Sequence, residues 1–420
     1  MADSQVLVPD REFVDEILAS GGGDLKKCYQ CATCSVVCEL APDDRPFPRK
    51  EMVWAQWGLK DRLVGDPDVW LCHQCNDCSL RCPRGARPGD VLAAVRQHAV
   101  RHYAVPKALA IWVNDIRMVP LMLLVSAGLL GGALMARESI ENAMGLTAHE
   151  GFYAAFFPHW LLNTFFPFFT GLAFLVAVTG VARFWGAMKR ADAAAGTNQP
   201  VRGVLSSLLR TVRAVLFHDR FGNCGVQASR RVAHLTAFYG FMALYVVTIW
   251  AVIDLYVNPA LGVASLYPFG LLHPMKLLAN AGGVLLIFGG VKTIVDRRRV
   301  APGTPVSTAF DWVFVSLLVG VGVTGFATEV FRFTVDTSAT GAIVTIAYAV
   351  YFVHLVLVFQ LLVYLPYSKF AHVLYRTVAM VYAEHMGRTT NGRKLSGGAP
   401  VTLHVKDAES PKAVEAVATT

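Results

Sequence analysis

Two cysteine runs decide how the first hundred residues fold: Cys28-Tyr-Gln-Cys31-Ala-Thr-Cys34-Ser-Val-Val-Cys38 and Cys72-His-Gln-Cys75-Asn-Asp-Cys78-Ser-Leu-Arg-Cys82-Pro83. They hold every cysteine of the chain except Cys224, and both have the spacing C-x2-C-x2-C-x3-C. Residues 1–23 are acidic and contain no apolar core of a secretory signal. We therefore expect a reducing, cytosolic setting with metal-bound thiolates in place of disulfides.

The repeated spacing is typical of bacterial two-cluster ferredoxins. In that pattern three thiolates of one run hold one 4Fe-4S cluster, and the fourth cysteine reaches the other cluster. The sequence therefore predicts the following ligands: Cys28, Cys31, Cys34 and Cys82 for cluster 1, and Cys72, Cys75, Cys78 and Cys38 for cluster 2. A zinc site of four thiolates is the alternative, but it leaves four cysteines unused. Glu39 stands where the second run has Pro83, and no C-x-x-C-H motif for covalent haem occurs.

The composition after the cysteine runs indicates a membrane protein. Only 16% of the residues are charged and 54% are hydrophobic, with a mean hydropathy of +0.45, whereas soluble domains carry about 25% charged residues. A bilayer span needs about 20 apolar residues, and six stretches are long enough: 118–136, 160–185, 232–256, 274–295, 310–331 and 341–365. The net charge is +8. The basic residues lie beside these stretches and form no stripe with interleaved aromatic residues, so no nucleic-acid partner is expected.

Shorter elements and loop charges complete the expected organisation. A helix capped by Asp10, one helix between Glu39 and Leu71, a helix from Gly89 to about Tyr103 and an interfacial helix around Trp112 are predicted. Basic residues concentrate in 186–231, at 297–299 and after 366, which places both termini and the cysteine domain in the cytoplasm of a bacterial inner-membrane protein. The expected domains are 1–104 (iron–sulfur), 105–387 (membrane) and 388–420 (a disordered tail).

Histidines inside or beside the spans are candidate haem ligands, because ionisable residues in membrane helices are functional by default. His234 begins the third span on the basic side, His354 lies inside the sixth, and His372 follows eighteen residues later. On one continuous helix eighteen residues make five turns, which puts both rings on one side about 27 Å apart. The sequence therefore predicts haem b near each membrane face. The expected fold is all-α: a ferredoxin-type α-helical two-cluster domain followed by a six-helix transmembrane haem b bundle.

These residues carry a resemblance to known families. The segment from His354 through Leu365-Pro366 to His372 resembles the last haem-binding helix of the cytochrome b subunit of respiratory nitrate reductases, and the stretch from His234 to Phe241 resembles its partner helix. Residues 24–105 resemble the iron–sulfur C subunit of heterodisulfide reductases. The fusion is similar to the membrane subunit of the quinone-interacting membrane-bound oxidoreductases of sulfate-reducing and sulfur-oxidising bacteria.

The resemblance implies a haem held by His234 and His372, but it leaves the second haem one ligand short. The nitrate-reductase helix has a second histidine ten residues after the first, and Leu244 stands there in this chain. We expect His273 to pair with His354, with His159 as the fallback. Lys276 and His159 are candidate contacts for a quinone or for haem propionates.

The leading functional hypothesis is electron transfer between menaquinone, b-type haems, two 4Fe-4S clusters and a soluble partner. The chain has no dinucleotide fold and no nucleophile constellation, so substrate chemistry is expected on other subunits. The resemblance implies flavin-containing subunits similar to heterodisulfide reductase A, and beyond them adenylylsulfate reductase. The alternatives are a subunit of a heterodisulfide-reductase-like or other quinone-linked complex, or a haem-free membrane anchor for a ferredoxin module.

Overall fold

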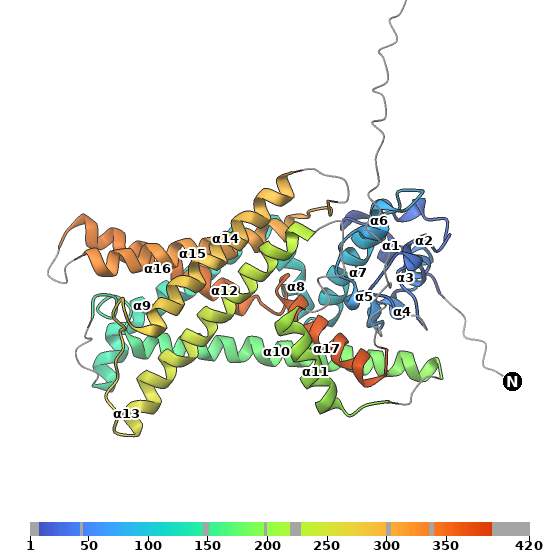
Figure 1. The fold of residues 1–420 in the computed structure, drawn as a ribbon. Helices are drawn as coiled ribbons and strands as arrows, with labels where there is room; N and C mark the ends of the chain where they lie inside the picture. The colour runs from blue at the N-terminus through green and yellow to red at the C-terminus, as the bar shows by residue number, and fades with distance from the viewer. Residues whose placement is uncertain are drawn as a thin grey trace, which may run out of the picture.

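The described part of the chain is helical throughout and contains no strand. The computed structural model describes residues 8–42, 45–145, 151–196, 200–218, 228–299, 304–335 and 340–388. A small helical domain lies at one end of a bundle of long helices (Figure 1). Cys224 and the expected tail beyond 388 lie outside the described residues. The all-α fold and the six apolar helices are confirmed.

Short helices separated by turns build the cysteine domain. Asp10 caps α1 (Arg11–Ala19), its carboxylate accepting from the Phe13 amide, as predicted. The domain also contains these elements: η1 (Leu25–Lys27), α2 (Thr33–Val36), α3 (Arg49–Gln56), α4 (Lys60–Val64), α5 (Asp68–Leu71), α6 (Asp77–Leu80) and α7 (Pro88–Tyr103). The single helix expected between Glu39 and Leu71 is wrong, because three helices occupy that segment. Gly58, at φ +66°, ends the first of them, and there a Cβ would lie 2.7 Å from the Asp10 carbonyl oxygen.

Six long helices form the bundle: α9 (Val119–Met144), α10 (His159–Ala194), α12 (Ala228–Val252), α14 (Pro274–Arg298), α15 (Ala309–Thr334) and α16 (Ala342–Val363). Within their most apolar windows only 11% to 28% of the residues are buried inside the protein. Most of their apolar side chains therefore face outward, as a bilayer-facing surface requires. The short helix α8 (Lys107–Val113) carries Trp112 before the first of them, as expected.

Small residues let the helices approach closely. A Cβ on Gly289 of α14 would lie 2.5 Å from the Ala237 amide nitrogen of α12, and one on Gly240 would lie 2.6 Å from the Gly282 carbonyl oxygen. Glycines at such contacts are the usual means by which membrane helices pack backbone against backbone. This packing fixes α12, which carries His234, against α14.

The sixth span ends before His372, so the expectation of one continuous helix from His354 to His372 is wrong. Helix α16 stops at Val363, and a separate helix, α17 (Ala371–His385), begins after seven residues of turns. Pro366 explains the break, because proline has no N–H to donate and disfavours helical backbone in the residue before it. The 27 Å separation derived from a straight helix therefore does not apply.

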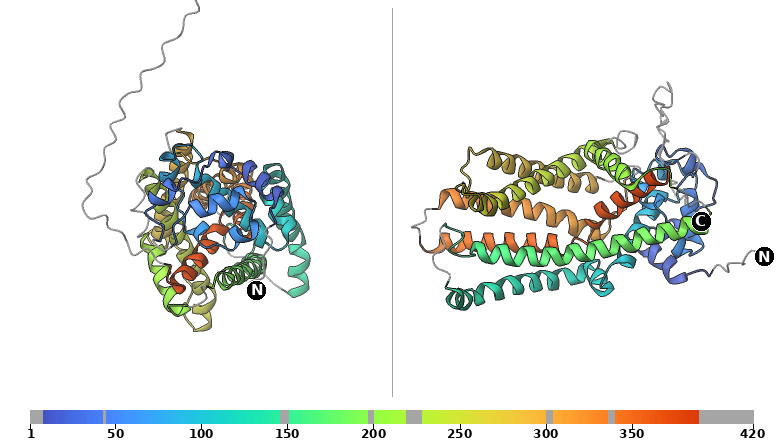
Figure 2. Two further views of the ribbon diagram at one scale, coloured as in Figure 1. Left: turned by 90° about the vertical axis from the view of Figure 1, so that its right-hand side faces the viewer. Right: turned by 90° about the horizontal axis from the view of Figure 1, so that it is seen from below.

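Helix α10 joins the bundle to the cysteine domain. Its 36 residues extend about 54 Å at 1.5 Å per residue, well beyond the roughly 30 Å hydrocarbon core of a bilayer. Its far end runs alongside the cysteine domain (Figure 2). Phe184 and Met188 of α10 belong to the same buried core as Trp70, Leu92 and Tyr375. The two parts are thus packed together through one hydrophobic core.

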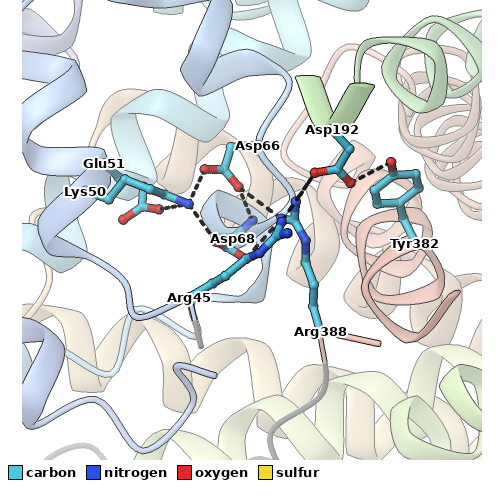
Figure 3. Close-up of polar contacts among 8 residues, drawn as sticks. All are labelled: Arg45, Lys50, Glu51, Asp66, Asp68, Asp192, Tyr382 and Arg388. Atoms are coloured by element: carbon cyan, nitrogen blue, oxygen red, sulfur yellow. Dashed lines mark hydrogen bonds and ion pairs between the residues drawn. The ribbon is translucent and has the colours of Figure 1, made fainter. Parts of the chain in front are cut away.

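A buried ionic cluster ties the same junction together (Figure 3). The Lys50 ammonium lies 2.8 Å from carboxylate oxygens of Asp66 and Asp68 and 3.2 Å from Glu51. Arg388 contacts Asp66 and Asp68 at 3.8 Å and pairs with Asp192 at the end of α10. Arg45 and the Tyr382 hydroxyl also bind Asp192. Arg388, which the sequence assigns to the tail, is buried because these carboxylates surround it.

Candidate metal centres

The two cysteine loops have matching backbone conformations. Gln30 and Ala32 in the first loop have φ of 60° and 67°, and Gln74 and Asn76 in the second have φ of 52° and 63°. Such values are uncommon outside glycine and mark strained or functional backbone. The turn directs amides at sulfur, since the Gln30 amide donates to Cys28 Sγ at 3.4 Å and the Gln74 amide to Cys72 Sγ at 3.3 Å. Each loop is therefore shaped to wrap its first thiolate.

The fold brings the cysteines together in two groups that cross between the runs. Cys34 lies near enough to Cys28, Cys31 and Cys82 for their charges to interact. Cys38 interacts in the same way with Cys72 and Cys75, and Cys78 with Cys72, Cys75 and Cys38 and, most weakly, with Cys34 of the other run. Helices α2 and α6, which follow the second cysteine of each run, pack against each other. These neighbours agree with the crossed ligand sets expected from the spacing, and the assignment of each cysteine to a cluster stays a prediction.

The thiols need a bound cation to become thiolates. Burial raises the pKa of Cys34 to about 11 and that of Cys38 to about 12, with neighbouring thiols adding to both shifts. Bound iron supplies the compensating positive charge. Cys31 differs, because its side chain is exposed and the Thr33 hydroxyl lowers its pKa. The donor set, the matching loops and the burial fit two iron–sulfur clusters.

A cavity of about 380 Å³ lies between the cysteine domain and the bundle. One wall is the second cysteine loop, represented by Cys72, His73 and Gln74. The opposite walls come from α12, α15 and α17, and include the apolar side chains Phe238 and Phe314. The cavity is therefore bounded by the cluster 2 loop on one side and by the bundle on the other.

Four histidines line this cavity: His73 on the second cysteine loop, and His218, His234 and His372 on the opposite side. His234 comes from α12 and His372 from α17, and their side chains are close enough to interact electrostatically. Burial lowers the pKa of His372 to about 4, so its imidazole is neutral, the form that binds a metal. The His218 ring centroid lies 5.2 Å from that of His234. The structure thus places His234 and His372 on one cavity together with His218 and His73, and the role of His234 and His372 as haem ligands stays a prediction.

Arginines beside the cavity bind the backbone of the second cysteine loop and of the residues just before it. Arg376 of α17 donates to the Cys72 carbonyl at 3.1 Å, and Arg230 of α12 donates to the Gln74 carbonyl at 2.8 Å. Arg96 of α7 donates to the Val69 carbonyl at 2.9 Å. All three arginines line the cavity. The cavity is also lined by Asp90, Asp296 and Asp311. The three guanidinium groups suit the propionates of a haem.

Aromatic rings connect the second cysteine loop to α17, the helix that carries His372. Trp70, two residues before Cys72, stacks on Tyr375, three residues after His372, with ring centroids 5.3 Å apart. Tyr103 and Phe184 contact the same tyrosine ring. The loop of cluster 2 and the helix that carries His372 are therefore packed as one unit.

The residues expected to hold a second haem, His354 with His273 or His159, each contact different side chains. The Thr324 hydroxyl lies 3.0 Å from Nδ1 of His354, and a Cβ at Gly325 would come within 3.1 Å of that ring. His273 caps α14, its Nδ1 accepting from the Met275 amide at 3.2 Å, and its ring stacks on Phe269. His159 contacts Tyr267 edge to face at 5.7 Å. The pairing of His354 with His273 stays a prediction.

Lys276, expected near a quinone, forms an ion pair with Glu329 of α15 at 2.9 Å, and both side chains are 15% exposed. The Gly320-Val-Gly322-Val-Thr-Gly325 stretch, which matches a nucleotide-binding pattern by letter, lies inside α15 and contacts neighbouring helices. It serves helix packing.

His218 and the arginines of the cavity were not predicted from the sequence. A signal for two of the arginines is present, because Arg230 precedes His234 by four residues and Arg376 follows His372 by four. Four residues on a helix put side chains on one face. His218 lies just beyond α11 (Val204–Phe217), a helix that was not expected, so its approach to His234 is purely tertiary.

Comparison with known proteins identifies the first domain. Residues 24–86 match the 4Fe-4S dicluster domain family. Over 95 residues the chain is 39% identical to the C subunit of the H(2):CoB-CoM heterodisulfide,ferredoxin reductase of Methanothermobacter marburgensis, covering 22% of this chain and 50% of that protein. It is 36% identical over 106 residues to an Archaeoglobus profundus protein similar to the C subunit of heterodisulfide reductase, covering 25% and 56%. The chain thus spans about half the length of these relatives.

One relative extends over nearly the whole chain. Citrate utilization protein B of Escherichia coli is 27% identical over 402 residues, covering 91% of this chain and 96% of that protein. No solved structure matches the chain significantly. The chain therefore has an N-terminal 4Fe-4S dicluster domain similar to the C subunit of heterodisulfide reductases, joined to six helices long enough to cross a membrane.

Proposed function

We propose that the chain is a membrane-anchored electron-transfer subunit that links quinone in the bilayer to a soluble redox partner. The observation that carries this proposal is the shared cavity, whose walls are the Cys72–Gln74 loop and the helices of His234 and His372. Arg376 and Arg230 fix that loop to the bundle. A haem-free anchor has no need for two histidines from different helices that line one cavity with a cysteine loop.

Two 4Fe-4S clusters are proposed on the crossed cysteine groups, and they supply one-electron transfer. Cys28, Cys31, Cys34 and Cys82 hold cluster 1, and Cys72, Cys75, Cys78 and Cys38 hold cluster 2. Support comes from the matching loops and from the amides that donate to sulfur. Such hydrogen bonds stabilise the thiolate form and tune cluster potentials.

A b-type haem between His234 and His372 would supply one-electron transfer beside cluster 2. The two neutral imidazoles offer axial nitrogens. Arg230, Arg376 and Arg96 would hold the propionates, and Phe238 and Phe314 would exclude water. A second haem on His354 and His273, with menaquinone near Lys276 and His159, is the corresponding proposal for the opposite end of the bundle.

Two classes of partner fit the proposal. The heterodisulfide-reductase-like domain favours flavin-containing subunits similar to heterodisulfide reductase A, serving adenylylsulfate reductase. The likeness over 402 residues to a citrate utilization protein favours a partner in carboxylic acid utilization. Affinity purification of the tagged protein from its native membrane, followed by mass spectrometry, separates the two. Recovery of neither a flavoprotein nor another redox protein would contradict the proposal.

The crossed ligands are tested by Cys38→Ser. Because Cys38 lies with Cys72 and Cys75, we expect this variant to alter the EPR spectrum of the Cys72 cluster and to leave the other spectrum unchanged. Cys82→Ser is the matched variant and should alter the Cys28 cluster. The assignment is wrong if each substitution damages the cluster of its own run.

The haem site is tested by reduced-minus-oxidised visible spectra of His234→Ala and His372→Ala. Each should lose the same b-type component, since both imidazoles face one cavity. His98→Ala is the control, because that ring binds Glu16 on α1. Absence of b-type bands in the unmodified protein would leave the haem-free anchor as the correct account.

A further inference from the structure

We propose, on the basis of the function proposed above, that the face around Cys31 is the docking surface for the acidic face of a soluble one-electron redox protein. We call it the Cys31 face and define it by Lys26, Tyr29, Cys31, Val36, Arg81 and Arg84. Three properties support the assignment: accessibility, an apolar centre and a basic rim.

The first loop is the more accessible of the two: Cys28 is half-buried and Cys31 exposed, whereas the corresponding Cys72 is buried and Cys75 half-buried, and the third cysteine, Cys34 or Cys78, is buried in both. Cys72 and Cys78 are 9% and 8% exposed, and Arg376 and Arg230 hold their loop against the bundle. Cys31 of the other loop is exposed. Helix α2, which follows that loop, lies on the side of the domain away from the long helices (Figure 1). A protein approaching from solution therefore reaches the Cys28–Cys34 loop.

Large apolar side chains of the two cysteine runs are exposed. Tyr29 is 69% exposed and Val36 is 80% exposed. Leu80 of α6, the helix packed against α2, is also exposed. Within the described part of residues 8–104, the other exposed large hydrophobic side chains are Val8 and Trp57. Most of the apolar exposure of this domain is thus gathered at its two cysteine helices, and such gathering marks interaction sites.

Basic side chains border the apolar centre. The Arg84 guanidinium lies 4.2 Å from the Tyr29 ring centroid and donates to the Tyr29 hydroxyl at 3.1 Å. Arg49 donates to the Gln30 carbonyl at 2.9 Å. The exposed cations of the Cys31 face are Lys26, Arg81 and Arg84, and the neighbouring Lys27 and Arg49 are exposed as well. Glu39 is exposed too, and Asp24 pairs with Lys27 at 2.6 Å.

The excess of positive charge on the Cys31 face favours a partner with an acidic face. Complementary charge steers association and favours an acidic face over a neutral or basic one. The apolar centre with exposed aromatic and aliphatic side chains suits a protein contact, whose core excludes charge. Proximity of the partner to the cluster bound by Cys31 is what a one-electron exchange requires.

Binding to two probe proteins tests the proposal without using turnover. The full-length protein in nanodiscs is titrated with flavodoxin, which is acidic, and with cytochrome c, which is basic. We expect flavodoxin to bind more tightly, and its affinity to fall as salt screens the surface charges, over a Debye length of about 10 Å at 0.1 M. The double variant Lys26→Glu/Arg84→Glu should weaken flavodoxin binding by about tenfold or more.

The control is Arg210→Glu/Arg213→Glu on α11, which makes the same change in net charge at two exposed positions away from the cysteine loops. It should leave flavodoxin binding unchanged. Equal weakening in both double variants, salt-independent binding, or preference of the unmodified protein for cytochrome c would overturn the proposal. Iron and haem contents of the same samples report separately on the function proposed above, since the binding assay depends on neither quinone nor haem.

Discussion

Removing Arg388 is predicted to unbalance the ionic cluster that joins the cysteine domain to α10 and α17. Arg45, Lys50 and Arg388 face the carboxyls of Glu51, Asp66, Asp68 and Asp192 (Figure 3). Burial raises the pKa of Glu51 to about 8, so at neutral pH this carboxyl is protonated and three cations balance three carboxylates. Arg388→Met leaves one buried carboxylate without its cation.

The burial of the Arg388–Asp192 ion pair sets the expected loss in the free energy of unfolding. The side chains of Arg388 and Asp192 are 8% and 3% exposed, and breaking a buried pair by removing one partner costs about 3–5 kcal/mol. That is on the order of a hundredfold or more in the ratio of folded to unfolded protein. Asp192→Asn alone should cost a similar amount, whereas Arg388→Met/Asp192→Asn restores the balance. The double variant should therefore be more stable than the sum of the single effects by about 1–3 kcal/mol.

Thermal bleaching of the cluster absorbance in detergent, together with tryptophan fluorescence, measures these effects. Arg11→Met is the control, because Arg11 pairs with Asp15 at 3.8 Å with 95% of its side chain exposed, and exposed pairs contribute about 0–1 kcal/mol. Additive single effects, or a loss in Arg388→Met no larger than in Arg11→Met, would refute the reasoning.

The other predictions concern the same junction and the bundle. The folded protein keeps the Glu51 proton, whereas the unfolded chain releases it above the ordinary pKa of 4.5, so the free energy of unfolding should fall as pH rises from about 5 to 8. Glu51→Gln should flatten that decline in melting curves recorded at several pH values. An unchanged slope would contradict the assignment of the decline to Glu51. Gly289→Ala should destabilise by about 1–3 kcal/mol and reduce haem content, because its Cβ meets the α12 backbone, whereas Gly171→Ala meets open space and should change neither. Ser126→Ala removes the 2.8 Å hydrogen bond from α9 to Gln360 of α16 and should cost about 0.5–2 kcal/mol in detergent melting; no change would show that the bond contributes nothing net.

Periodic and repeated features of the sequence predicted most of the fold. Apolar stretches of about 20 residues predicted all six long helices, and Asp10 predicted the start of α1. The matched cysteine spacing predicted that the two runs approach each other, and the structure places cysteines of both runs side by side. These features are local, because each depends on spacing within one segment.

Tertiary features were not predictable in the same way. Pro366 is visible in the sequence, yet the five-turn spacing from His354 to His372 favours one helix, and the structure shows a break at that proline. His218 lies at the end of α11 and reaches His234 of α12 through tertiary packing, beside the hydrogen bond from the Tyr239 hydroxyl to the Leu216 carbonyl. Arg388 resembles the start of a polar tail, and carboxylates from distant segments bury it. Such contacts have no signature in the sequence around the residue.

The central claim is that a redox group held by His234 and His372 connects membrane quinone to the cluster on the Cys72 loop. Menaquinol-driven reduction of the clusters, followed anaerobically by stopped-flow absorbance in nanodiscs, tests it most directly. We expect rapid reduction in the unmodified protein and in His98→Ala. In His372→Ala, menaquinol should no longer reduce the clusters, although dithionite still does. Reduction by menaquinol at the unmodified rate in His372→Ala would contradict the claim.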